Sequence, residues 1–134
     1  MEFMKQYRVL VIKAKADLKA GKNLLEDIEQ GDEELDIGVV MFHLQQSAEK
    51  LLKALLSYHQ HHYTKTHSIR ELIGAVQRYN IAMPEQSEQL IPLSYYAVEG
   101  RYAVIHDDME DVDKYILRLD ELVHFINEMI SLSE

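Results

Sequence analysis

An arginine and a histidine near the end of the chain have the types and spacing that metal-free phosphodiester chemistry uses. Arg101 is followed five positions later by His106, which makes an Arg-x4-His pattern. A histidine serves as general acid or base near pH 7, and an arginine beside it stabilises a pentacovalent phosphate. The pair therefore suits RNA cleavage in which the 2′-hydroxyl attacks the adjacent phosphate. Residues five apart on an ideal helix point about 140° away from each other, so the two converge only across a helix break or a dimer interface.

Arg101 also interrupts an apolar helix face. The helical phase of Leu90, Ala97 and Ile105 places it inside their apolar sector. An unpaired buried charge is costly, so an arginine there needs a partner or a route to solvent. Two interpretations stay open: a cation held in a cleft or dimer seam for phosphate, or an arginine paired with a core carboxylate such as Asp17.

Cations lie on two other helical patterns. His43, Gln46, Lys50 and Lys53 follow one another at steps of three, four and three, so they form one polar stripe. Such a stripe is usually solvated, but it can also rim a groove in which Lys50 and Lys53 meet phosphates as point charges. A second, basic stripe lies near the start of the chain and consists of Lys5, Arg8, Lys15, Lys19 and Lys22. A solvated face is the favoured interpretation of this basic stripe.

Four histidines gathered in one connector raise the question of a metal site. His59, His61, His62 and His67 fall within nine residues. Zinc needs three or four ligands in fixed geometry, and helical histidine pairs are usually four residues apart. The connector offers neither that spacing nor an acidic residue. We therefore expect a solvated loop, with no metal and no cofactor.

The composition limits the class of protein. The 134 residues, 47% apolar and 28% charged, suit a single globular domain over residues 1–134. The lack of cysteine excludes disulfides and thiolate metal sites. A formal net charge of −9 argues against a globally basic, DNA-specific binder. No apolar run approaches the roughly 18 residues of a membrane span, and no signal-peptide core is present, so we expect a cytoplasmic protein without membrane binding.

Hydrophobic periodicity predicts an all-α, up-and-down bundle of four to five helices. The second helix has the widest apolar face and a favourable Glu49–Lys53 pair. Pro92 should bend or split the fourth pattern. The expected helices cover residues 5–30, 34–59, 67 or 68–79, 85–105 and 109–131.

Several segments resemble HEPN domains. Residues 44–56, Leu-Gln-Gln-Ser-Ala-Glu-Lys-Leu-Leu-Lys-Ala-Leu-Leu, are similar to the second helix of that family, and Glu-Lys-x-x-Lys-Ala is the most specific part. Residues 16–18 resemble the first helix, and residues 65–69 the start of the third. Two further pieces, Tyr95-Tyr96 and Arg101-Tyr102, match a later aromatic-and-arginine segment, so the resemblance covers nearly the whole chain.

The resemblance implies a four- or five-helix bundle that often forms homodimers. In prokaryotes it also implies a small nucleotidyltransferase partner in toxin–antitoxin-like pairs. One branch of the family consists of metal-independent RNases whose Arg-x4–6-His motifs face each other across the dimer. Another branch lacks that activity, is viewed as nucleotide-binding, and typically has Arg-Tyr-Pro at this place.

This sequence has features of both branches. Arg101-Tyr102 resembles the nucleotide-binding branch, with Ala103 in place of the proline, whereas Arg101 and His106 match the spacing of the RNases. The RNases usually have a small polar residue after the arginine and a tyrosine two residues after the histidine, where this chain has Tyr102 and Asp108. Carboxylates beside the motif repel an RNA phosphate and favour a protonated histidine.

The leading hypothesis is a homodimeric accessory protein with a nucleotidyltransferase partner. It would bind nucleotide or RNA phosphate through Arg101, Tyr102, Lys50 and Lys53. The first alternative is a metal-independent endoribonuclease with Arg101 and His106 as the catalytic residues. The second is a non-catalytic dimerisation or antitoxin-binding module.

Overall fold

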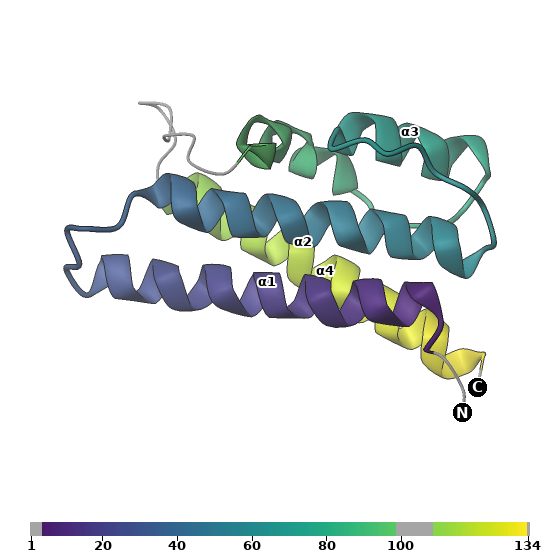
Figure 1. Ribbon diagram of the computed structural model, residues 1–134, viewed down its shortest axis with the longest axis horizontal. Coiled ribbons are helices and arrows are strands. Elements are labelled where there is room, and N and C mark those ends of the chain that lie inside the picture. The colour runs from purple at the N-terminus through teal and green to yellow at the C-terminus, as the bar shows by residue number, and fades with distance from the viewer. Residues whose placement is uncertain (1–3, 99–108, 134) are drawn as a thin grey trace.

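Helices make up all the regular structure in the part of the chain that the computed structural model describes, residues 4–98 and 109–133. The elements are α1 (Gln6–Glu29), α2 (Ile37–Tyr58), α3 (Ile69–Arg78), the 3-10 helix η1 (Ser87–Ala97) and α4 (Met109–Leu132). Figure 1 shows α1 alongside α2, with α3 and η1 along another side of α2 and α4 behind the pair. The predicted all-α bundle is confirmed.

Small and polar side chains bring α1 and α2 close together in antiparallel orientation. Ser47 Oγ of α2 donates a hydrogen bond of 2.9 Å to the backbone oxygen of Ala14 in α1. At Gly21, an added Cβ would lie only 2.9 Å from Cδ2 of Leu44. The spacing of small and apolar residues in the first helix therefore predicts its packing face correctly, because Ala14 and Gly21 lie at the contact.

The core is centred on α2, which contacts each of the other four elements. Its leucines Leu44, Leu51 and Leu55 have no exposed surface. They pack in one apolar cluster with Leu90 of η1 and Leu119 of α4, which are equally buried. Burying each such side chain stabilises the fold by about 1.5–3 kcal/mol. The helix with the widest apolar pattern is therefore the central one.

Side-chain caps set two helix starts within a few residues of the expected positions. Asp36 accepts a 2.9 Å hydrogen bond from the backbone nitrogen of Gly38, so α2 begins at Ile37. The sequence predicted a start at residue 34, three residues too early. Ser68 accepts a hydrogen bond from the backbone nitrogen of Glu71 and caps α3 as expected.

The fourth helical pattern differs most from expectation. An α-helix over residues 85–105 was expected, but the described part forms the 3-10 helix η1, which ends at Ala97. Pro92 lacks a backbone N–H and clashes with the preceding turn of an α-helix. Ser94 Oγ accepts a 2.9 Å hydrogen bond from the backbone nitrogen of Ile69 and so ties η1 to the start of α3.

The final helix runs antiparallel to α1. Lys22 Nζ of α1 lies 2.7 Å from Oδ1 of Asp120 in α4, and the start of α1 and the end of α4 lie at the same end of the bundle (Figure 1). The α1–α4 pairing completes the described bundle.

Within residues 4–98 and 109–133, no helix combines the length and apolar character needed to cross a membrane.

Candidate functional site

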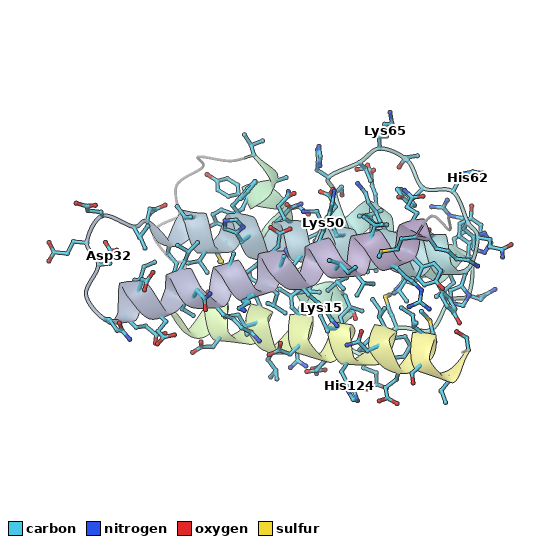
Figure 2. The ribbon with its side chains drawn as sticks, turned by 60° about the horizontal axis from the view of Figure 1, so that its bottom comes forward. Lys15, Asp32, Lys50, His62, Lys65 and His124 are labelled. Atoms are coloured by element: carbon cyan, nitrogen blue, oxygen red, sulfur yellow. The ribbon has the colours of Figure 1, made fainter. Side chains whose placement is uncertain are left out.

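The polar stripe of α2 lies in the structure between α1 and the connector that leads to α3. Its members His43, Gln46, Lys50 and Lys53 are all partly buried. Figure 2 shows Lys50 next to α1, on the side toward the connector that carries Lys65. The stripe therefore faces neighbouring elements instead of open solvent.

On the α1 side, the carboxylate of Asp17 contacts two side chains of α2. Lys50 Nζ lies 2.5 Å from Oδ2 of Asp17, and His43 Nδ1 lies 3.2 Å from Oδ1. The side chains of Asp17 and Lys50 are only 18% and 23% exposed. This partial burial strengthens their attraction relative to a pair in open water. Asp17 is thus the carboxylate that holds the first lysine of the stripe.

On the connector side, Glu49 is the acceptor. Its carboxylate lies 2.9 Å from Lys53 Nζ and 2.9 Å from Nδ1 of His67, and Gln45 donates to it at 3.2 Å. Lys53 also lies over the ring of Tyr63, 5.7 Å from its centre. The Glu49–Lys53 pair expected from the i, i+4 spacing is confirmed.

The hydrogen bonds determine the protonation of Glu49. Burial raises the pKa of this carboxyl, but hydrogen bonds from Lys53, His67 and Gln45 outweigh burial, and the pKa is lowered from its ordinary value. Glu49 therefore stays ionised near neutral pH. A carboxylate in this state holds cations and is unsuited to act as a general acid.

Two glutamines join the two halves into one network. Gln46 Nε2 donates to Gln45 Oε1 at 2.8 Å, and Lys50 Nζ donates to Gln46 Oε1 at 3.4 Å. Gln45 also donates to the backbone oxygen of His67 at 3.2 Å. The result is a signature network, defined here as Asp17, His43, Gln45, Gln46, Glu49, Lys50, Lys53 and His67.

Every lysine of this network is already paired with a carboxylate. The charges of the two lysines and the two acids therefore cancel within the network. A phosphate that binds Lys50 or Lys53 must compete with Asp17 or Glu49 for the ammonium group. His67 is the most accessible member, because 71% of its side chain is exposed.

Sequence patterns identified only part of this network. They placed Lys50 and Lys53 on one stripe, but they did not predict that Lys50 and His43 contact Asp17. His67 was considered among the connector histidines and as a possible start of the third helix, and neither pattern predicted its contact with Glu49.

The three remaining expected site residues lie outside the described residues. Arg101, Tyr102 and His106 belong to the segment 99–108, which follows η1 and precedes α4. The Arg101–His106 pairing, and the pairing of Arg101 with Asp17, therefore stay predictions.

The connector histidines take several different environments. His61 stacks on Tyr79, with ring centres 3.8 Å apart. Burial, and secondarily the charge of His61, lower the pKa of His59. In the described ranges, no three histidine, aspartate or glutamate side chains come together as a metal site.

The fold is an all-α bundle in which polar residues of the central helix α2 contact both α1 and the connector that leads to α3. A comparison with protein families matches the HEPN domain over residues 7–129. The chain belongs to the HEPN family. No curated protein and no solved structure matches it significantly.

Proposed function

We propose that this HEPN protein is a homodimer that binds nucleotide or RNA phosphate and works beside a small nucleotidyltransferase, as in toxin–antitoxin-like pairs. The observation that carries the proposal is the pair Lys50 and Lys53, three residues apart on the helix that bears the family signature. Both lysines lie in a seam between elements and are partly buried, with side chains 23% and 14% exposed. Arg101 and Tyr102 would supply the remaining contacts from the segment before α4.

Phosphate recognition at this seam works by exchange of partners. Each lysine stem is held in place by packing and by its carboxylate, so little side-chain entropy is lost when a phosphate arrives. The cost is that the phosphate must displace Asp17 or Glu49, or bind beside it. This competition favours ligands with several phosphates, such as a nucleoside triphosphate or an RNA strand, over a single phosphate.

Direct binding measurements test the proposal. We expect ATP or a fluorescent oligoadenylate RNA to bind the full-length protein at low salt, and Arg101→Ala to weaken binding about tenfold, which corresponds to ~1.4 kcal/mol. If three cations contact a single strand, log K should fall with log salt with a slope of about −2. No saturable binding of either ligand at low salt would contradict the proposal. Light scattering of the same sample measures the dimer.

The enzyme alternative rests on the Arg-x4-His spacing of Arg101 and His106. In it, Arg101 stabilises the phosphate and His106 transfers the proton. The test of the RNase alternative is cleavage of single-stranded RNA in EDTA by wild type, Arg101→Ala and His106→Ala. Loss of cleavage in both variants supports the RNase, whereas equal inactivity of all three proteins rules it out. Failure of both binding and cleavage leaves the non-catalytic interaction module.

A further inference from the structure

A cleft of about 340 Å³ opens between α1 and α4, at the end of the bundle where α1 begins and α4 finishes. Ile130 of α4 is buried in its lining. Two other lining residues, Met4 and Ile12, are 57% and 55% exposed. Single exposed apolar residues are ordinary on a protein surface, but apolar side chains that line one cleft together mark a surface suited to docking.

Basic side chains of α1 border the same cleft. Arg8 and Lys15 line it, and Lys19 and Lys22 continue the basic stripe along the helix. Lys22 pairs with Asp120 of α4 at 2.7 Å. Lys15 and Lys19 are exposed, and neither pairs with a carboxylate in the described part of the chain. The cleft therefore combines apolar surface with the positive charge of Lys15, which no carboxylate of the described residues compensates, and Lys19 lies one helical turn further along α1.

The basic stripe is separate from the signature network. At ~100° per residue, Arg8, Lys15, Lys19 and Lys22 lie roughly 140–180° around α1 from Asp17. Figure 2 shows Lys15 on the side of α1 toward α4 and Lys50 on the other side of α1. Occupation of the cleft thus leaves the lysines of the network untouched.

We propose that the α1–α4 cleft docks an acidic amphipathic helix of a partner protein. The cleft is locally basic although the chain as a whole has a net charge of −9, and local charge complementarity favours an acidic ligand there. Arg8 and Lys15 are seven residues apart, about 10 Å along the helix axis. A helix with acidic residues seven apart matches that separation, and apolar residues between them reach Ile12.

A second copy of this chain fits the cleft less well than a different protein. Its α4 has the required order of an acid, an exposed apolar residue and an acid in Asp113, Leu117 and Asp120. However, Asp120 is already paired with Lys22. Docking of α4 from another copy would break that intramolecular contact, whereas a separate acidic helix costs no such contact. This docking surface goes beyond the proposed function and does not depend on it.

A designed peptide tests the cleft. The probe is a fluorescein-labelled amphipathic peptide of about 18 residues, or five helical turns, with glutamates seven apart and leucines between them. Fluorescence anisotropy should show saturable binding to the full chain, weakened about tenfold by Lys15→Glu. Ile12→Ser should weaken it about threefold or more. The matched control is Lys13→Glu, the same charge change at an exposed lysine on the far side of α1, which should change the affinity less than about twofold.

Several results would overturn the proposal. They are no saturable binding, equal binding of a scrambled peptide, or an equal loss with Lys13→Glu. A wild-type homodimer that Lys15→Glu dissociates, as judged by light scattering, would identify a second copy as the occupant instead. ATP and RNA binding should be unchanged in Ile12→Ser, so failure of the cleft and failure of the proposed function can be told apart.

Discussion

Lys50 of α2 reaches across the helix interface to Asp17 of α1, and the ammonium nitrogen lies 2.5 Å from a carboxylate oxygen. The contact joins a residue of the central helix to an acidic residue on the partly buried side of the first helix. It links α1 and α2, the two helices that pack most extensively against each other, and so fixes the rotation of one relative to the other. It also limits what Lys50 can do, because any anion that binds Lys50 must compete with Asp17 for the ammonium group.

Removing the charge of Asp17 should destabilise the fold. Asp17→Asn leaves Lys50 and His43 without their acceptor in a seam where both are partly buried. We expect a loss of about 1–2 kcal/mol in the free energy of unfolding, measured by urea titration. Asp120→Asn is the matched control, because it breaks the exposed pair with Lys22 and should cost less than about 1 kcal/mol. Equal losses of unfolding free energy in the two variants would show that partial burial does not strengthen the contacts of Asp17 with Lys50 and His43.

The same substitution should strengthen phosphate binding if Lys50 contacts the ligand. In Asp17→Asn the amine of Lys50 no longer has a competing carboxylate, so the affinity for ATP should rise about threefold to tenfold. Asp120→Asn changes the net charge equally and controls for long-range attraction. A rise of the same size in both variants would indicate only a general charge effect. No rise in either would show that Lys50 braces the helices without binding phosphate.

Glu49→Gln should make stability less dependent on acid pH. The pKa of Glu49 in the folded protein is lowered from its ordinary value of 4.5. The unfolded state therefore binds the proton more readily, and the stabilisation is complete above that pH and lost as the pH falls through the lowered folded pKa. At pH 7 we expect the variant to be about 2 kcal/mol less stable than wild type, because the hydrogen bonds from Lys53 and His67 lose their ionic component.

The measurement is urea unfolding at a series of pH values from neutral down to acid. The difference between wild type and Glu49→Gln should shrink below pH 4.5. Glu128→Gln, an exposed glutamate on α4, is the control and should show a small difference at every pH. A constant gap between wild type and Glu49→Gln across the series would contradict the linkage.

Ser68→Ala should destabilise the start of α3. Ser68 Oγ accepts the hydrogen bond from the backbone nitrogen of Glu71, and loss of such a cap costs about 1 kcal/mol. Ser131→Ala makes the same chemical change at an exposed position in the last turn of α4 and should stay within about 0.5 kcal/mol of wild type. Thermal unfolding of both variants compares the two costs. If the two variants melt alike, the cap has no measurable role.

Periodicity and side-chain chemistry predicted much of the fold. The helical spacing from Val11 to Leu25 and the wide apolar face of α2 each specify a buried surface that local sequence alone can display. The Glu49–Lys53 pair was equally readable, because residues four apart on a helix are neighbours whatever surrounds them. Boundaries were less accurate, since the start of α2 depends on which of several acidic residues caps it, and Asp36 does so.

The sequence by itself determined the all-α class, the wide apolar face of α2 and the stripe that carries Lys50 and Lys53. Only the tertiary structure decided which partners those lysines have. Asp17 and Lys50 are 33 residues apart, and Glu49 and His67 are 18 apart, and the members of each pair lie on different elements, so the period of a single helix cannot relate them. Their meeting follows from the antiparallel packing of α1 on α2 and from the path of the connector into α3. The physical reason is that hydrophobic periodicity records which face is buried, whereas the pairing of charges at a seam depends on the register of the two elements that form it.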